Sequence, residues 1–305
     1  MAQTVRQEQA LGVSLPDVEG ALSDLRGGDH AGSVRATTLN LIVHVAAEAD
    51  VAETLEVLES VGRSRPLRAI VVQAGDGSPV ADVSSACWAG VGGEICTERI
   101  VITGEADALP SAVESLLVPD LPVFVWWQGP VPDDRLLYQL AFGATRLIID
   151  SSEVGLEAVR RYRPRLPCVA DLAWRRLAPW REAIASLFDG RGQRAALEHM
   201  IGVEVRGPAN EGELLAGWLR SRLGRQVGLD LVSRTKHLNS VELHCGDKEF
   251  VVRRLRRNDH GVATGPGMAE HVVLLPIVEP VRLVAAELDH IGAERVFDEA
   301  LAALA

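Results

Sequence analysis

The residues most able to carry chemistry in this chain include four cysteines, and two of them lie close together. Cys87 and Cys96 flank the loop GVGG, which joins two apolar stretches typical of a β-hairpin. The pair could face each other and form a redox-switchable disulfide. Alternatively, both could be small buried strand residues in a reducing compartment. Cys168 and Cys245 have no cysteine nearby, and we expect them in the core.

Histidines are the next candidates for a metal or acid–base site. His237, His244 and Cys245 come nearest to a ligand cluster, but adjacent strand residues such as His244 and Cys245 point to opposite faces. We therefore predict no metal site. His44 lies in an apolar strand, which favours a core histidine over a catalytic base. The sequence contains no P-loop, GxGxxG, HExxH, CxxC or GxSxG motif, so we predict neither a cofactor nor catalytic residues.

The densest basic run consists of Arg253, Arg254, Arg256 and Arg257. On a strand, Arg254 and Arg256 share one face, which would suit a phosphate or an acidic partner surface. The alternative is a solvated sheet edge guarded by charge. The whole chain is acidic, with 42 Asp and Glu against 31 Lys and Arg and a net charge of −11 at pH 7, which disfavours nucleic-acid binding.

Tryptophans could anchor a protein partner. Trp126 and Trp127 end the apolar stretch LPVFVWW, at the carboxyl end of an expected strand, where open α/β sheets meet ligands and partners. Because neighbouring strand residues face opposite sides, one of the two could lie at a surface as an anchor. The alternative is that both pack under helices.

A second group of tryptophans and arginines lies around Pro179. The proline should divide the helical stretch 171–189 into two helices, with Ala178 at the boundary. Trp174 and Trp180 flank this break and are expected to pack. Trp174 could also form a partly exposed anchor patch, together with Arg175 and Arg176.

Alternating strands and helices must position these residues. We expect strands at 37–46, 67–73, 83–89, 94–103, 121–127 and 144–150, with helices at 50–61, 106–117 and 133–140. This order predicts an α/β fold, with a mixed, mostly parallel sheet that is covered by helices and contains one antiparallel hairpin.

The chain length of 305 residues suggests more than one domain. We expect an N-terminal tail with one short helix at 1–35, an α/β domain at 36–165 and a smaller α+β C-terminal domain at 166–305. The sequence has no apolar run long enough to span a membrane, and its start lacks the apolar core of a signal peptide. We therefore predict a cytoplasmic protein that does not bind membranes.

Four segments, taken together, resemble the OpcA family of glucose-6-phosphate dehydrogenase assembly proteins. They are LLVPDLPVFVWWQG at 116–129, RATTLNLIV at 35–43, SSACWAGVGGEICTERIVI at 84–102 and DLAWRRLAPWREAIASLFD at 171–189. The first segment is long and specific, and the other three support it. The resemblance covers about residues 30–290, and it is weaker from residue 225 onward.

The resemblance implies a non-enzymatic protein that binds glucose-6-phosphate dehydrogenase and favours its active oligomer, thereby supporting NADPH production in the oxidative pentose phosphate pathway. It also implies a set of signature residues, with Arg175 and Arg176 as candidate contacts. The signature residues are Trp126, Trp127, Trp174, Trp180 and Arg181. The alternatives are a phosphosugar- or nucleotide-binding regulatory module, or a phosphosugar enzyme that uses the Arg253–Arg257 cluster. The oligomeric state of the chain itself is left open.

Overall fold

The computed structural model describes residues 4–25, 37–90, 93–166, 168–233, 235–255 and 259–304. The chain divides into two compact units, neither of which is continuous in sequence. The first unit comprises Met1–Val154, Arg161–Ala170 and Pro280–Gly292. The second unit comprises Gly155–Arg160, Asp171–Glu279 and Ala293–Ala305. The segment 280–292 therefore returns to the first unit, whereas the sequence analysis placed it in a C-terminal domain.

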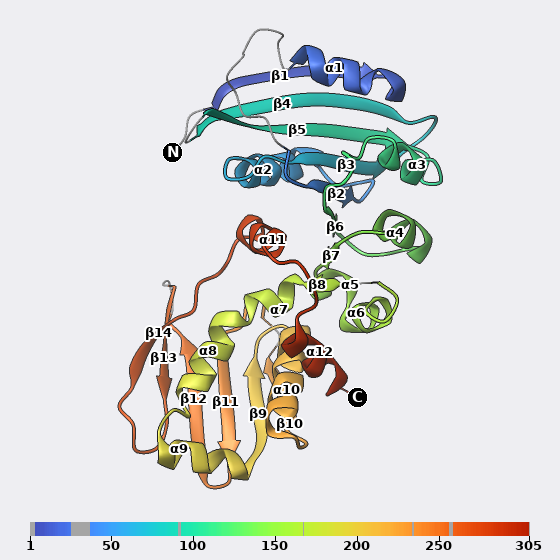
Figure 1. The fold of residues 1–305 in the computed structure, drawn as a ribbon. Coiled ribbons are helices and arrows are strands. Elements are labelled where there is room, and N and C mark those ends of the chain that lie inside the picture. The colour runs from blue at the N-terminus through green and yellow to red at the C-terminus, as the bar shows by residue number, and fades with distance from the viewer. Residues whose placement is uncertain are drawn as a thin grey trace. The chain divides into compact units, whose positions relative to one another are not determined.

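The first unit is built on a sheet of eight strands with the order β1-β4-β5-β3-β2-β6-β7-β8 (Figure 1). The strands are β1 (Thr4–Val13), β2 (Asn40–Val45), β3 (Arg68–Ala74), β4 (Val80–Gly90), β5 (Gly93–Gly104), β6 (Val123–Trp127), β7 (Arg146–Ile149) and β8 (Val169–Asp171). Strands β5, β3, β2, β6 and β7 run parallel to their neighbours in this series. Strands β1 and β4 are antiparallel additions at one edge. The mixed, mostly parallel sheet and its hairpin are thus confirmed.

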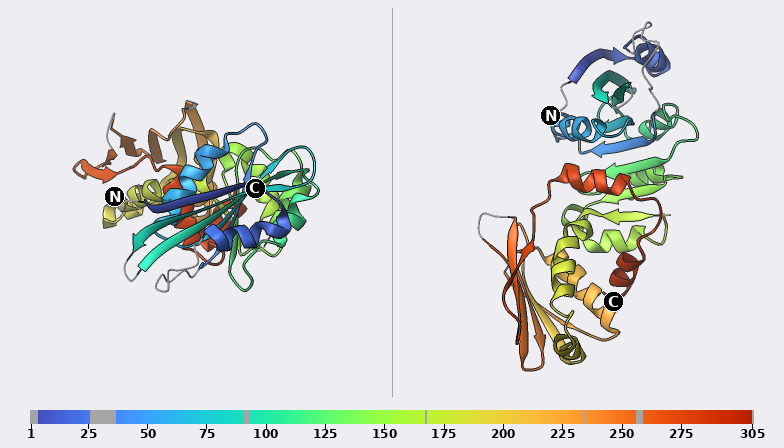
Figure 2. Two further views of the ribbon diagram at one scale, coloured as in Figure 1. Left: turned by 90° about the horizontal axis from the view of Figure 1, so that it is seen from above. Right: turned by 60° about the vertical axis from the view of Figure 1, so that its left-hand side comes forward.

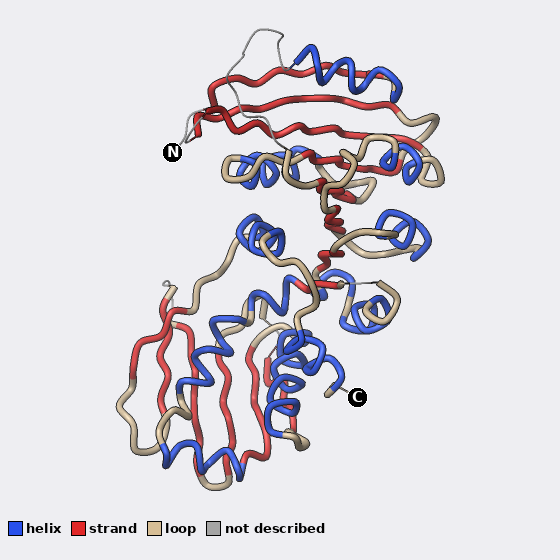
Figure 3. Tube along the Cα trace, viewed as in Figure 1, coloured by secondary structure: helices blue, strands red, loops and turns tan. Residues whose placement is uncertain are grey.

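Helices connect the parallel strands and cover the sheet (Figure 3). They are η1 (Leu15–Asp17), α1 (Val18–Leu25), α2 (Val51–Gly62), α3 (Leu109–Glu114), α4 (Asp134–Ala141), α5 (Ser151–Val154) and α11 (Pro280–Leu288). Helix α6 (Leu156–Tyr162) lies between β7 and β8 in sequence, and most of its residues belong to the second unit. As expected, Asp50 caps α2, and its carboxylate accepts a hydrogen bond from the backbone N–H of Ala52. All six residues of β2 are buried, as its apolar sequence NLIVHV requires.

The order of the strands determines where this sheet can meet a ligand. From β2 the chain builds outward to β3 on one side, and it later returns to place β6 on the other side. The direction of building therefore reverses between β2 and β6. In open α/β sheets, ligands bind outside the carboxyl ends of the strands at such a reversal. In this chain those ends are Val45 and Trp127.

The N-terminal segment is more than the tail with one short helix that the sequence predicted. The expected helix is present as α1, but β1 precedes it and pairs with β4. The strand was missed because its side chains are mostly polar, and those described are exposed or half-buried. An edge strand of this kind is held by backbone hydrogen bonds rather than by an apolar face, so it leaves little periodicity to detect.

The second unit contains a sheet of six strands, with the order β10-β9-β11-β12-β13-β14. The strands are β9 (Met200–Arg206), β10 (Gly228–Ser233), β11 (Ser240–Cys245), β12 (Lys248–Arg254), β13 (His260–Thr264) and β14 (His271–Leu274). Strands β9 and β10 are parallel, and the others form an antiparallel meander. Together with its helices, this sheet confirms the smaller α+β part that the sequence predicted.

Helices cover one face of the second sheet, as the right-hand view of Figure 2 shows. They are α7 (Leu172–Arg176), α8 (Ala178–Ser186), α9 (Arg191–Ala196), η2 (Leu197–His199), α10 (Ala209–Leu223) and α12 (Arg295–Ala302). The core beneath them includes Val205, Leu243 and Val252, which are fully buried. Pro179 stands in the first turn of α8 and separates it from α7, as predicted. No described helix has the length and apolarity that a membrane crossing requires.

Candidate functional site

Trp126 and Trp127 lie in β6, and both are buried, with 6% and 1% of their surface exposed. Strand β6 is paired by β2 and β7, and its last four residues are all buried, so both of its faces belong to the core. Of the two alternatives, the structure supports the burial of both tryptophans, and the exposed anchor is wrong. The Trp127 indole Nε1 donates a hydrogen bond to the carbonyl oxygen of Pro130 at 3.3 Å. The one polar atom of this buried side chain therefore has a partner within the first unit.

His44 stacks on Trp127, with ring centroids 3.5 Å apart and planes 7° from parallel. The two residues are register partners on β2 and β6, where the strand order reverses. Burial lowers the pKa of His44 to about 4, against a weaker opposing contribution from Gln128. The imidazole is therefore neutral at pH 7. Its Nδ1 is buried without a hydrogen-bond partner among the described residues. His44 is thus a core histidine, as expected.

Trp174 and Arg181 form a packed cluster inside the second unit. The Arg181 guanidinium lies 3.5 Å from the Trp174 ring centroid, and the indole Nε1 donates to Glu294 Oε1 at 2.8 Å. The Trp174 ring also stacks with the Phe297 ring, with centroids 5.3 Å apart. Burial lowers the pKa of Arg181 to about 10, and Glu294 opposes this effect. Trp174 is 1% exposed, so it packs as expected and does not form an exposed anchor.

Trp180 contributes to a small pocket in the second unit, which we call the Arg176–Arg254 pocket. Its volume is about 50 Å³. The lining residues come from α7, α8, α10, β12 and two loops, and they are Arg176, Trp180, Glu211, His237, Leu238, Arg254, Pro276, Ile277 and Val278. Sequence reasoning considered four of these residues separately, but nothing in the local pattern indicated that they meet.

The polar residues of this pocket hold one another in place. Arg176 Nε donates to Glu211 Oε1 at 2.9 Å, and the Glu211 side chain is only 7% exposed. The Arg254 guanidinium lies 5.5 Å from the Trp180 ring centroid. Arg254 also donates through Nε to the carbonyl oxygen of Leu238 at 3.1 Å and through Nη1 to that of Leu275.

The arginine run does not act as a single patch in the described part of the chain. Arg254 belongs to the helix-covered face of β12, as do the buried residues Phe250 and Val252. Arg253 alternates to the other face and is exposed. The face that Arg254 and Arg256 are expected to share as an anion site therefore stays a prediction, since Arg253 was not part of it. Arg256 and Arg257 lie outside the described residues, and Arg175 is half-buried on α7.

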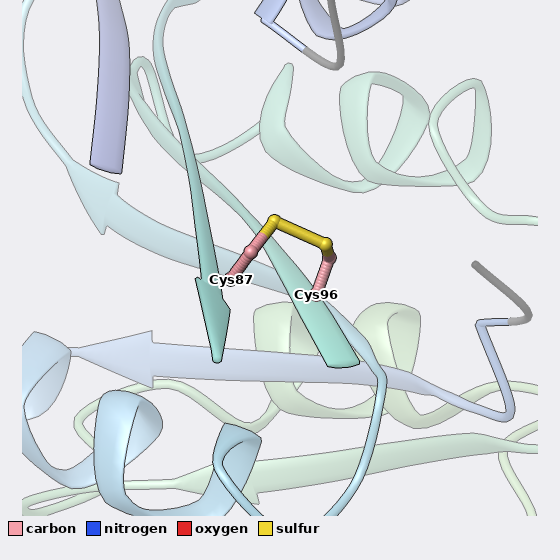
Figure 4. The surroundings of a disulfide bond; sticks show 2 residues. All are labelled: Cys87 and Cys96. Carbon is pink, nitrogen blue, oxygen red and sulfur yellow. A yellow bond between two sulfur atoms is a disulfide. The ribbon is translucent and has the colours of Figure 1, made fainter. Parts of the chain in front are cut away.

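Cys87 and Cys96 are joined by a disulfide across the β4–β5 hairpin (Figure 4). The hairpin register places the two residues directly opposite each other. The structure thus pairs the two cysteines, while a redox role for the bond stays a prediction. Cys168 and Cys245 are buried, as expected.

Two buried ion pairs in the first unit were not identified from the sequence. Arg146 Nη1 contacts Glu287 Oε2 at 2.5 Å, and both side chains are at most 3% exposed. Arg68 Nε contacts Glu98 Oε2 at 2.8 Å. The sequence signal that could have indicated these pairs is the arginine at the start of each apolar strand. Among the residues that the structure describes, no group of three or more His, Cys, Asp or Glu side chains could hold a metal ion.

Two family models match this chain. The model described as the glucose-6-phosphate dehydrogenase subunit N-terminal domain matches residues 59–163. The model described as the C-terminal domain of the same subunit matches residues 167–301. Together they cover most of both compact units.

Curated relatives carry the name "Putative OxPP cycle protein OpcA". The protein from Synechococcus elongatus is 34% identical over 52% of this chain and 38% of its own length. The protein from Nostoc punctiforme is 27% identical over 68% of this chain and 56% of its own length. The protein from Synechocystis is 33% identical over 42% of this chain and 30% of its own length. The chain thus spans between about a third and just over half of the curated relatives it matches.

A solved structure of aldose–aldose oxidoreductase from Caulobacter crescentus, complexed with glycerol, is also similar, with a TM-score of 0.44 and 10% identity. The match covers 88% of this chain and 94% of that one. The two domain models in sequence order, together with the three relatives, show that the chain belongs to the OpcA family of glucose-6-phosphate dehydrogenase assembly proteins.

Proposed function

We propose that this protein is a non-catalytic factor that binds glucose-6-phosphate dehydrogenase and favours its active oligomer. The observation that carries the proposal is the pair of dehydrogenase-subunit domain models that match residues 59–163 and 167–301. The names of the relatives place them in the oxidative pentose phosphate cycle, so we further propose that the chain supports NADPH production there.

The proposed activation acts through a conformational equilibrium of the dehydrogenase. A partner shifts such an equilibrium only by its differential affinity for the two states. A difference of about 2–3 kcal/mol is typical of allosteric coupling and would raise the population of the active state about 30- to 150-fold when that state is rare. No catalytic group of the factor needs to enter the dehydrogenase active site.

The burial of the four signature tryptophans assigns them a supporting role in this proposal. Trp174 and Trp180 hold α7 and α8 against the rest of the second unit, and the exposed parts of these helices remain available to a partner. We retain Arg175 and Arg176 as candidate contacts, because both are only half-buried on α7. Arg175 is the better test residue, since Arg176 also makes the ion pair with Glu211.

The decisive experiment measures the specific activity of the dehydrogenase from the same organism with and without this protein, together with size-exclusion chromatography of the mixture. We expect activation and co-elution at low salt. Arg175→Glu should weaken both effects, and the melting temperature of the variant, measured alongside, must show that it is folded. Arg191→Glu, at an exposed arginine that begins α9 in the second unit, is the control.

The absence of both activation and complex formation, in oxidised and in reduced samples, would refute the proposal. Equal losses in the Arg175 and Arg191 variants would indicate a general charge effect instead of a specific contact. The alternative of a phosphosugar enzyme that uses the Arg253–Arg257 cluster would be supported by turnover of a phosphosugar by the protein alone.

A further inference from the structure

The Arg176–Arg254 pocket has the composition of an anion site. It brings together two guanidinium groups, one imidazole and the aromatic face of Trp180, and its single carboxylate, Glu211, is already in contact with Arg176. With His237 neutral, the formal charge of the lining is +1, from two arginines and one glutamate. The pocket therefore carries positive charge in a protein whose net charge is −11.

The hydrogen bonds of Arg254 leave part of its guanidinium available. Its described contacts use Nε and Nη1, which donate to two backbone carbonyl oxygens. These two bonds fix the plane of the group, while Nη2 makes no hydrogen bond within the described residues. An arginine that is held in this way presents its remaining donors in a fixed direction, which lowers the entropic cost of binding an oxyanion.

The lowered pKa of His237 reflects the same arginines, together with Lys236. Burial is the largest cause of its lowered pKa, and Lys236, Arg254 and Arg176 lower it further. Only Glu279 raises it. Positive charge thus surrounds the imidazole, and the same charge would favour an anion at this position.

The volume of the pocket determines the class of ligand. About 50 Å³ is room for a few water molecules, and therefore for a single phosphoryl or carboxylate group rather than for a whole sugar or nucleotide. The rest of a larger ligand would lie outside. We propose that this pocket binds the phosphoryl group of a small phosphorylated metabolite, with Arg176 and Arg254 as the charged contacts and Trp180 as one wall. The proposal does not depend on the dehydrogenase partner.

The proposal can be tested with the full-length protein alone, by isothermal titration with inorganic phosphate, a hexose 6-phosphate and acetate. We expect both phosphates to bind and acetate to bind at least about tenfold more weakly, because it has less charge and fewer acceptor oxygens. Arg176→Gln should weaken phosphate binding about tenfold through the loss of one charge-assisted contact.

Two further variants separate binding from folding. Glu211→Gln removes the negative charge while keeping the shape of the side chain, and should tighten phosphate binding roughly three- to tenfold. A purely structural role of Glu211 cannot produce tighter binding. Arg253→Gln is the matched control, because it removes an arginine from the opposite face of the same strand, and we expect less than about a twofold change.

Specific outcomes would overturn the proposal. One is the absence of a binding isotherm for either phosphate with folded wild-type protein. A second is unchanged or weaker binding by Glu211→Gln, and a third is an equal loss in Arg253→Gln and Arg176→Gln. Binding of acetate as tight as that of phosphate would assign the pocket to carboxylates, and would refute the phosphoryl assignment.

Discussion

The buried imidazole of His44 should make the first unit sensitive to acid. Burial lowers the pKa of this group to about 4, from an ordinary value of 6.5. Between these two values, the unfolded chain takes up a proton at residue 44 that the folded chain does not. The free energy of unfolding must therefore fall as the pH falls through this window. Above pH 6.5, residue 44 is neutral in both states, so none of this stability is lost.

The size of the effect follows from the two pKa values. Each unit of difference is worth about 1.36 kcal/mol, so the loss relative to pH 8 is about 2 kcal/mol at pH 5 and about 3 kcal/mol at pH 4. This loss is a large part of the stability of an ordinary domain. The imidazole is only 7% exposed, so solvent screening does not reduce the effect greatly.

The assay is urea unfolding of the full chain at pH 8, 6, 5 and 4, compared with that of His44→Phe. Phenylalanine keeps a ring against Trp127 but cannot be protonated, so carboxylate titrations common to both proteins cancel in the difference. We expect the stability of the wild type relative to the variant to decrease by about 3 kcal/mol between pH 8 and pH 4. His260→Gln, at an exposed position on β13, should show no such change relative to the wild type.

Parallel stability curves for the wild type and His44→Phe would refute this reasoning. So would a directly observed imidazole titration of residue 44 near pH 6.5 in the folded protein. Either result would mean that the ring has access to water, or that its Nδ1 has a partner.

Three further predictions concern stability. Glu287→Gln should destabilise the first unit by about 3 kcal/mol in urea unfolding, because it leaves Arg146 buried without its charged partner; a loss below about 1 kcal/mol would contradict the buried-pair interpretation. Reduction of the Cys87–Cys96 disulfide should cost about 2–3 kcal/mol, as expected for a bond that closes a loop with a sequence separation of 9. If the melting temperature is unchanged after reduction, with labelling showing that both thiols are free, that estimate is refuted. Trp127→Ala should cost about 3–5 kcal/mol and lower activation of the dehydrogenase only in proportion to the unfolded fraction. Loss of activation in a folded Trp127→Ala protein would restore a direct contact role.

The candidate site was predictable only in its parts. Arg176, Trp180 and Arg254 each attracted attention as an arginine or tryptophan in a distinctive segment. Their meeting was not predictable, because the pocket needs the register of β12 and the position of α10 as well as α7 and α8. Glu211 gave no signal at all, since one glutamate near the start of a helix is ordinary.

The local pattern of the chain determined the elements themselves. Apolar alternation and short apolar runs located the strands, Asp50 located a helix start, and Pro179 divided two helices. The segment around Cys87 and Cys96 indicated a hairpin, because its apolar stretches flank a glycine-rich turn. These features depend on neighbours within a few residues, so one sequence is enough to specify them.

Tertiary structure alone decided what each element packs against. It buried both tryptophans of β6, added the polar edge strand β1, and joined Arg146 to Glu287 over a separation of 141 residues. Periodicity shows which face of an element avoids water, but it does not identify the surface that covers that face. Charge pairs and pockets form where segments distant in sequence meet. Their energies depend on how deeply they are buried, and the local sequence pattern does not determine that burial.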